Sequence, residues 1–338
     1  MKDMPFSAMD FSAHLERRCG DMMRGVSRVA VAVSGGPDSM ALCHMLKEWR
    51  GPQVLALHVN HGLRPEAGRE AQELEMRLAG VGIDCKILTW EGEKPENKVQ
   101  EAARAARYEL MAEYCRKEGV AHLFLAHHED DQAETFLFRL AKGSGLDGLG
   151  GMAPVHQYSN DLKLIRPLLD VSKEALVEYC RTHDLPFFED PSNQNDKYAR
   201  VRLRRAREIL EEEGLSVKRL ATTAKRLSRA RLALDTLAQN LYQKATLIKD
   251  THSIVLDFEI WREQPEEISL RALQKAMTDL AAGAKIENKY GPRMERVEDL
   301  FEDLIRPVPF RKRTLGGIVL KRTDQDGGAK IILSAEGR

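Results

Sequence analysis

A short apolar segment followed by a glycine turn constrains this chain more than any other part of its 338 residues. Residues 29–33 read Val-Ala-Val-Ala-Val, which predicts a strand buried in a parallel sheet. The sequence Ser-Gly-Gly-Pro-Asp-Ser follows at residues 34–39, and a helical pattern begins at Met40. A strand, a glycine turn and a helix in this order predict an α/β fold.

The chemistry of this turn predicts a site for phosphate groups. Its two glycines let the backbone approach a ligand, and the amides at the start of the next helix form an anion site. The serines add hydroxyl donors, and the carboxylate of Asp38 suits the turn if Mg²⁺ bridges it to phosphate. The alternative is an ordinary strand–helix turn. Two adjacent glycines, one aspartate and two serines within six residues disfavour it. The predicted nucleotide-binding residues of the turn are Ser34, Gly35, Gly36, Pro37, Asp38 and Ser39.

The turn is not one of the two common nucleotide loops. A Walker A loop requires Gly-x-x-x-x-Gly-Lys-Ser/Thr, and residues 29–46 contain no lysine. The dinucleotide pattern Gly-x-Gly-x-x-Gly is also absent from the turn. We therefore expect neither a P-loop NTPase nor a dinucleotide-binding domain.

Strand and helix patterns alternate along the first part of the chain. Further strands are expected at 54–59, 85–88 and 122–126, and helices at 66–80, 97–118, 130–141 and 172–183. This alternation predicts a doubly wound, Rossmann-like parallel sheet, in which ligands bind at the carboxyl ends of the strands.

The alternation stops at about residue 215. Helices are expected at 216–247, 266–282 and 296–305, and a weak hairpin signal lies within 313–334. We therefore place a domain boundary at Gly214, with the α/β domain at 1–214, which the resemblance described below implies is an ATP-binding catalytic domain. A mainly helical domain with a terminal β-hairpin is expected at 215–338.

Composition narrows the class of protein. The formal net charge is zero, and five widely spaced cysteines include no Cys-x-x-Cys pair, which argues against a disulfide framework, a zinc finger or a cysteine-held iron–sulfur cluster. Cys43 and Cys115 fall in helical apolar patterns and are expected to be buried. Residues 1–25 contain four acidic residues and no continuous apolar stretch, so we expect a cytoplasmic protein without a signal peptide.

Two polar clusters follow predicted strands. His58, Asn60 and His61 end the strand at 54–59; they can simply terminate it, but adjacent strand ends converge in this fold, which favours a place in the nucleotide site. The second cluster, His-His-Glu-Asp-Asp-Gln-Ala-Glu-Thr, begins at His127. Its carboxylates can serve as a helix cap, with Asp130 as N-cap, or bind Mg²⁺ and an amine. The pair of that cluster expected to share a helix face is Asp131 and Glu134.

Two further features complete the pattern. Arg104 and Arg107 share a helical face, which by spacing alone favours a solvated surface. Residues 189–196 form a polar loop leading to Arg200. Glycines at 143–151 predict a flexible loop that moves to admit a substrate.

The motifs together resemble two nested families. The turn at 34–39 is similar to that of PP-loop ATP pyrophosphatases, which hold the pyrophosphate end of ATP. Six further motifs resemble those of the tRNA(Ile)-lysidine synthetase family in order and spacing. They are His-Val-Asn-His-Gly-Leu-Arg, Glu-Ala-Ala-Arg-x-x-Arg-Tyr, His-His-x-Asp-Asp-Gln-x-Glu-Thr, Gly-Ser-Gly, Arg-Pro-Leu-Leu and Glu-Asp-x-Ser-Asn. The resemblance covers about 27–210. Val201 stands where that family usually has Asn, and Lys142 replaces a frequent Arg.

The resemblance implies a two-step reaction. ATP adenylates the wobble cytidine of an isoleucine tRNA with a CAU anticodon, and the ε-amine of free L-lysine then displaces AMP. It implies Asp38 and Asp131 as essential carboxylates that bind Mg²⁺, with Glu134 beside them and Arg107 at phosphate or RNA. His58, Asn60, His61 and His127 join the ATP site. His128 is offered as the base, and a homodimer is left open.

Local charge supports an RNA partner. Residues 200–231 contain eleven Lys or Arg against four Glu, and residues 306–322 contain six Lys or Arg and no acid. Solvated helix and hairpin faces are the alternative, but two basic stretches in a balanced chain favour RNA.

Three other functions stay open on the sequence alone. A tRNA thiolation enzyme shares the turn but typically needs paired cysteines, and a small-molecule amide ligase would not need the basic stretches. A non-catalytic RNA-binding protein would keep its affinity when Asp38 is replaced.

Overall fold

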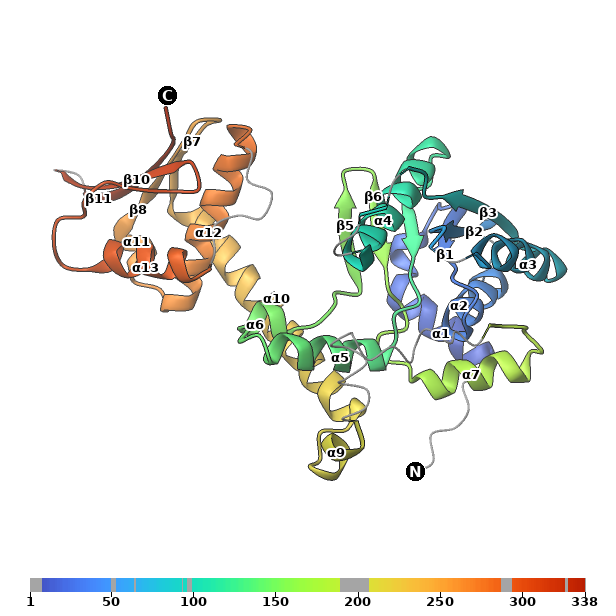
Figure 1. Cartoon of the computed structure of the whole chain (residues 1–338). Helices are drawn as coiled ribbons and strands as arrows, with labels where there is room; N and C mark the ends of the chain where they lie inside the picture. The colour runs from blue at the N-terminus through green and yellow to red at the C-terminus, as the bar shows by residue number, and fades with distance from the viewer. Residues whose placement is uncertain are drawn as a thin grey trace. The chain divides into compact units, whose positions relative to one another are not determined.

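The chain forms two compact units, Met1–Ser228 and Arg229–Arg338 (Figure 1). This computed structural model describes residues 8–49, 53–63, 65–92, 94–95, 99–188, 207–286, 294–325 and 328–337. No helix among these residues is long and apolar enough to cross a membrane.

A six-stranded sheet forms the centre of the first unit. In spatial order its strands are β3 (Asp84–Thr89), β2 (Gln53–Asn60), β1 (Arg28–Ala32), β4 (His122–Phe124), β6 (Leu162–Ile165) and β5 (Val155–Ser159). All neighbours pair in parallel except β5, which is an antiparallel edge strand. Chain order reverses between β1 and β4, so the loops after these two strands lie side by side at the carboxyl edge.

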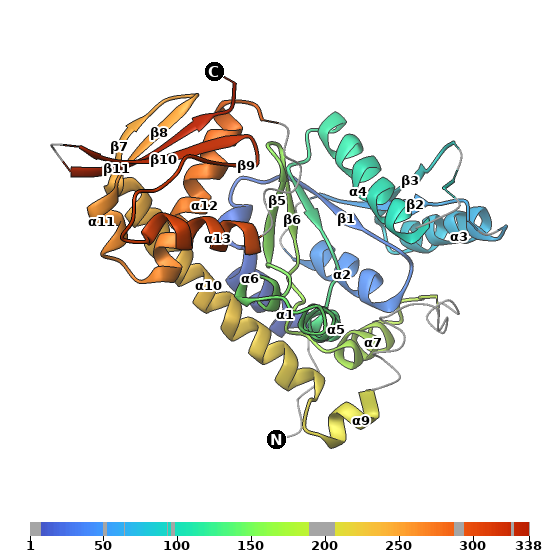
Figure 2. The ribbon, with the colours of Figure 1, turned by 60° about the vertical axis from the view of Figure 1, so that its left-hand side comes forward.

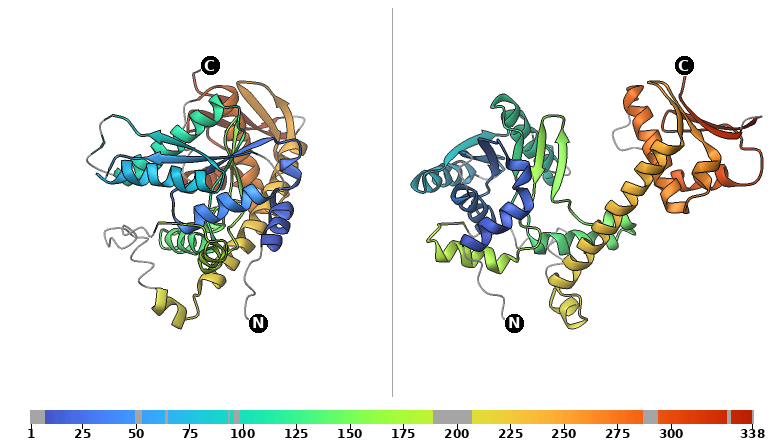
Figure 3. Two further views of the ribbon diagram at one scale, coloured as in Figure 1. Left: turned by 90° about the vertical axis from the view of Figure 1, so that its right-hand side faces the viewer. Right: turned by 180° about the vertical axis from the view of Figure 1, so that it is seen from behind.

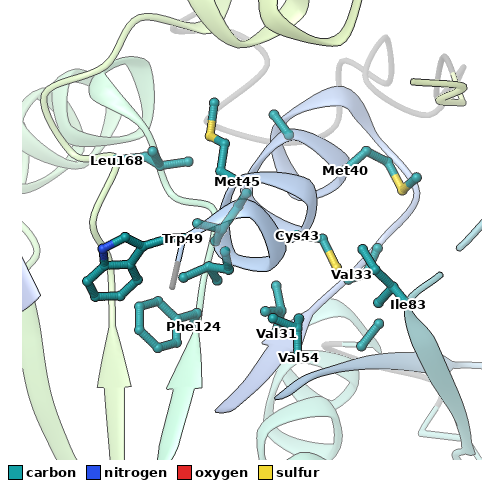
Figure 4. Packing of buried hydrophobic residues seen from close by; sticks show 14 of the residues in the cluster. Val31, Val33, Met40, Cys43, Met45, Trp49, Val54, Ile83, Phe124 and Leu168 are labelled. Atoms are coloured by element: carbon teal, nitrogen blue, oxygen red, sulfur yellow. The ribbon is translucent and has the colours of Figure 1, made fainter. Parts of the chain in front are cut away.

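Helices cover both faces of this sheet, which confirms the predicted doubly wound fold (Figures 2 and 3). Along β1, Val29 and Val31 face one core while Ala30 and Ala32 face the other. The first core is covered by α1 (Ala8–Cys19), α2 (Pro37–Glu48), α3 (Ala67–Gly80) and α7 (Lys173–Thr182), and the second by α4 (Val99–Lys117). Figure 4 shows Met40, Cys43 and Met45 of α2 packed on the first core.

Burial makes the two helical cysteines unreactive, as the sequence predicts. Cys43 and Cys115 are both buried, and burial raises the pKa of each thiol, to about 12 for Cys115. A thiol that stays protonated is neither a nucleophile nor a metal ligand at neutral pH.

The second unit combines helices with a five-stranded antiparallel sheet. Its strands, in spatial order, are β7 (Thr246–Lys249), β8 (Ser253–Asp257), β11 (Gly328–Ala335), β10 (Ile318–Gln325) and β9 (Arg313–Leu315). The β10–β11 pair confirms the predicted hairpin. Its helices are the second half of α10 (Val217–Ala245), then α11 (Phe258–Arg262), α12 (Glu266–Gly283) and α13 (Met294–Ile305). Sequence analysis missed β7 and β8, because β8 is fixed by pairing with the distant β11.

The division between the two compact units lies within α10, after Ser228. The first half of this helix belongs to the first unit, because Leu220 and Ala224 pack against Ala133 and Phe136 of α5 (Glu129–Leu140). The helix then continues into the second unit, where Leu241 and Tyr242 join its core. A compositional change marks where the α/β alternation ends, whereas packing decides which unit a helix joins.

Replacing Phe124 tests the first core. Phe124 lies on the central strand β4 with no exposed surface, so Phe124→Ala should lower the free energy of unfolding of this unit by about 3–5 kcal/mol through lost burial and an unfilled cavity. Denaturant unfolding followed by circular dichroism measures the change. Met76→Ala, at an exposed position of α3, should change stability by less than about 0.5 kcal/mol.

Candidate active site

The turn after β1 is closed by its own two serines. The Ser39 hydroxyl accepts a hydrogen bond from the Ser34 backbone amide at 3.2 Å and donates one to the Gly36 carbonyl at 3.0 Å. Gly36 is the N-cap of α2, and Pro37 begins the helix. The helix therefore starts inside the turn, and its first amides face the carboxyl edge of the sheet, as an anion site requires.

Phe188 fixes the first glycine of the turn. The Phe188 amide donates a hydrogen bond to the Gly35 carbonyl at 2.8 Å, and Arg77 stacks over the Phe188 ring, 4.0 Å from its centroid. Because carbonyl and amide point in opposite directions across a trans peptide, this bond directs the Gly36 N–H away from Phe188. Gly35 has φ +88°, and a Cβ there would lie 2.4 Å from the Phe188 ring. Only glycine fits this position.

The second polar cluster begins α5 and lies beside the turn. His128 is its N-cap, and the Asp131 carboxylate accepts a hydrogen bond from the His128 amide at 3.1 Å. The sequence prediction of Asp130 as N-cap is therefore wrong. Asp130 instead accepts a hydrogen bond from the Lys173 amide at the start of α7, which ties two helix N-termini together.

His128 gathers three carboxylates around one buried imidazole. Its Nε2 lies 3.6 Å from Oδ2 of Asp38 and 3.6 Å from Oδ2 of Asp131, and its Nδ1 lies 3.5 Å from Oδ2 of Asp130. The Nζ of Lys173 approaches Asp38 to 4.0 Å. The two carboxylates expected from the sequence to be essential thus meet across a single histidine.

The charge of His128 contradicts its suggested role as a base. Burial lowers the pKa of His128, but the carboxylates of Asp130, Asp38 and Asp131 outweigh this effect and raise it to about 10. The imidazole in this arrangement is protonated at neutral pH and has no lone pair with which to accept a proton.

Asp38 also offers an oxygen to a cation. Its Oδ1 is buried and has no hydrogen-bond partner among the described residues. Within that part of the chain no group of three or more His, Cys, Asp or Glu side chains is arranged to hold a metal ion by itself. The donor set fits Mg²⁺ that takes one or two carboxylates and completes its shell with phosphate oxygens and water.

The residues at the end of β2 have structural partners. His58 Nδ1 is hydrogen-bonded to the Val33 carbonyl, directly before the turn, at 3.0 Å. Asn60 Oδ1 accepts from the Gly62 amide at 2.9 Å, and His61 packs edge-on against Trp90. His58 therefore supports the turn from the neighbouring strand, while Asn60 shapes the bend that ends β2.

A cluster of arginines lies on the other side of the β4 end. Burial, together with the charges of Arg166, Arg104 and Arg107, lowers the pKa of His127 to about 3. Arg107 is partly buried on α4, and burial lowers its pKa. The adjacent histidines thus differ in charge, with a neutral His127 facing arginines and a cationic His128 facing carboxylates.

Several hydrogen bonds connect the glycine-rich segment at 143–151 to α5. Gln132 of α5 donates to the Met152 carbonyl at 2.9 Å and accepts from the Met152 amide at 2.7 Å. Arg139 donates to the carbonyls of Gly148 and Gly151 at 2.6 and 3.1 Å. The segment also contains a short helix, α6 (Leu146–Leu149). These bonds argue against the predicted flexibility.

The structure brings together most of the residues expected from the sequence. Asp38, Asp131 and His128 meet directly, and Glu134 lies half-buried one turn further along α5. Sequence analysis missed Lys173 and Phe188, since both approach the turn from distant segments and neither follows a glycine turn or a strand. Arg64, the loop at 189–196, Arg200 and Val201 lie outside the described residues.

Comparisons with known proteins agree on one family. A model of the PP-loop domain matches residues 9–212. A tRNA(Ile)-lysidine synthase of Methylobacterium nodulans is 40% identical over 98% of this chain and 96% of its own length. A second one, from a Methylobacterium species, is 42% identical over 91% of this chain and 89% of its own length.

One solved structure supports the fold alone. The U34-tRNA thiolase NcsA from Methanococcus maripaludis is 18% identical, with a TM-score of 0.56, covering 65% of this chain and 79% of that one.

Substitution of Gly35 should disable the turn. Gly35→Ala places a methyl group against the Phe188 ring and forces a left-handed backbone on a residue with a side chain, so we expect at least a tenfold weaker affinity for ATP. Isothermal titration with a non-hydrolysable ATP analogue measures it. Gly68→Ala, on an open face of α3, is the matched control and should bind as the wild type does.

The two histidines should titrate far apart. In the metal- and nucleotide-free protein, ¹⁵N imidazole shifts should show His128 protonated at pH 8 and His127 neutral at pH 5. Since the folded pKa of His128 lies above the unfolded value of about 6.5, its ion pairs stabilise the fold fully below pH 6.5. That contribution is lost as the pH rises towards 10. A midpoint near 6.5 for His128 would contradict the assigned contacts.

Proposed function

This chain belongs to the tRNA(Ile)-lysidine synthase family, and we propose that it joins L-lysine to the wobble cytidine of an isoleucine tRNA with a CAU anticodon, using ATP. The reaction would change decoding from AUG to AUA. The observation that carries the proposal is the meeting of the PP-loop carboxylate Asp38 with Asp131 of α5 across His128, within a chain that resembles these synthases over nearly its whole length.

In the first step we propose that the turn at 34–39 holds the pyrophosphate end of ATP. The O2 oxygen of the cytidine attacks the α-phosphorus, and the bond to the β-phosphate breaks to release pyrophosphate. The amides at the start of α2 stabilise the negative charge that grows on this leaving group. The closed serine pair and the Phe188 contact support this role, since donors fixed in advance need no rearrangement during reaction.

Magnesium fits Asp38, with Asp131 as a second candidate ligand. When bound, the ion offsets the charge of the phosphate oxygens. Lys173 and the His128 imidazolium balance the carboxylates and keep Asp38 oriented towards the turn.

In the second step the ε-amine of lysine attacks C2 of the adenylated cytidine and AMP leaves. Asp131 and Glu134 are the proposed partners of the lysine amino groups, because they lie three residues apart on α5 and share a face of the helix. An ammonium with a reference pKa of about 10.4 must lose a proton before it attacks. We assign that proton to one of these carboxylates, because the imidazolium of His128 already carries one.

RNA would be recognised by cationic groups on α4 and beyond. Arg107 lies in the same electrostatic environment as His127, at the carboxyl end of β4, and is the proposed contact to a phosphate group of ATP or tRNA. The basic stretch at 306–322 includes Arg311 and Lys312, which are exposed and suit the RNA backbone.

A labelling assay tests the reaction. The protein is incubated with ATP, radiolabelled lysine and tRNA with a CAU anticodon, and then with other amino acids and with a tRNA whose wobble base is altered. Label on RNA that requires lysine, ATP and the wobble cytidine supports the proposal. Label without RNA, or sulfur incorporation instead of lysine, would refute it.

Removing the Asp38 charge should abolish turnover. Asp38→Asn should lower kcat by at least about 100-fold and suppress pyrophosphate release, since the metal loses its ligand and the turn its oriented carboxylate. Pyrophosphate release is followed by a coupled phosphate assay, with tRNA binding recorded in parallel. Asp21→Asn, at an exposed ion pair with Arg24, should react normally. Full activity of Asp38→Asn would exclude this carboxylate from the chemistry.

A further inference from the structure

Three arginines of the first unit gather without acidic partners. Arg104 and Arg107 come from α4, and Arg166 follows β6 at the carboxyl edge of the sheet. All three lie close enough to His127 for their charges to lower its pKa. Among the described residues no carboxylate forms an ion pair with any of them. Like charges held together without a counter-ion repel each other, which favours an anion between them.

Arg166 is the buried member of this group. It is 9% exposed, and its Nη1 donates to the Ala153 carbonyl at 2.9 Å. Its Nε is buried and has no hydrogen-bond partner among the described residues. Leaving a buried guanidinium nitrogen unpaired is costly, so this position is built for a ligand with acceptor oxygens.

Tyr108 links Arg166 to the exposed surface. Burial lowers the pKa of Arg166, and the neighbouring Tyr108 opposes this effect. The guanidinium of Arg104 lies over the Tyr108 ring, 5.3 Å from its centroid. Both arginines therefore approach the same tyrosine, one from the interior and one from solvent.

An aromatic surface continues from this point. Tyr108 stacks on Tyr158 of the edge strand β5, with ring centroids 6.0 Å apart. Tyr158 is 41% exposed, which leaves ring surface open to a ligand. The charge of Glu109 acts on Tyr158.

We propose that Arg166 and Arg104 hold one phosphodiester of RNA, and that Tyr158 supports the adjoining nucleotide. The inference rests on the proposed function, and it extends the predicted contact of Arg107 to a second anion site separate from the PP-loop.

The chemistry of the cluster favours RNA over the smaller substrates. In the proposed function the amides after β1 bind the phosphates of ATP. The arginine cluster is open to solvent at the exposed Arg104, where a large substrate can reach it. A lysine carboxylate would satisfy the arginines but would make no use of an open tyrosine ring. Guanidinium groups beside stacked aromatic rings are how proteins hold a backbone and a base together.

Arg104→Gln tests the site, because this residue is exposed and its loss should not disturb folding. Binding of full-length tRNA is measured between 50 and 300 mM KCl, at about neutral pH. The slope of log Kd against log salt should fall by about 0.7, the value for one single-strand phosphate contact. The KM for tRNA should rise about fivefold or more, while the KM values for ATP and lysine stay within about twofold.

Arg116→Gln is the matched control, since it removes an exposed arginine from the far end of the same helix. It should leave slope and KM unchanged. Tyr158→Ala should weaken tRNA binding about fivefold or more without changing the salt slope, because stacking releases no counter-ions.

Other outcomes overturn the site. A raised KM for ATP or lysine with an unchanged tRNA slope would assign the anion to that substrate, and no change in any quantity would exclude the site. If Arg104→Gln lowers the salt slope of tRNA binding but the wild-type protein never forms lysidine, the RNA contact stands and the proposed reaction is refuted.

Discussion

The arrangement of the candidate site depends on one constraint, the reversal of strand order between β1 and β4. Parallel strands deliver their loops to the same edge, and the reversal leaves no intervening strand between these two. Asp38 at the start of α2 and Asp131 at the start of α5 therefore reach the same nitrogen of His128, at 3.6 Å each. Without the cationic imidazole, three carboxylates in a partly buried space would repel each other.

Two neighbouring histidines divide the site into an acidic side and a basic side. Successive side chains along an extended segment point in opposite directions, so His127 and His128 face different surroundings. Carboxylates hold the pKa of His128 near 10, whereas burial and arginines lower that of His127 to about 3. This division suits a reaction that brings a cationic amine and polyanionic substrates to the same strand end, because each finds opposite charge.

Sequence predicted the elements whose pattern is local and missed contacts set by tertiary packing. The apolar run of β1 and the glycine turn were recognisable because burial on both faces and positive φ each demand particular residues. The edge strand β5 was missed although it pairs with its sequence neighbour β6, because its residues are mostly exposed and form no apolar pattern. The strand β8 was missed because pairing with the distant β11 defines it. The charge of His128 was misjudged for the same reason. Acidic residues follow His128 directly in the sequence, but Asp38 comes close to it only in the folded chain.

The helix that bears the proposed amine-binding carboxylates is anchored from its opposite face. Ala133 and Phe136 of α5 pack on Leu220 and Ala224 of α10. Gln132 and Arg139 of α5 hydrogen-bond to the glycine-rich segment and to Met152 after it. α10 continues without interruption into the core of the second unit. The element that fixes Asp131 and Glu134 in the first unit is therefore also part of the second.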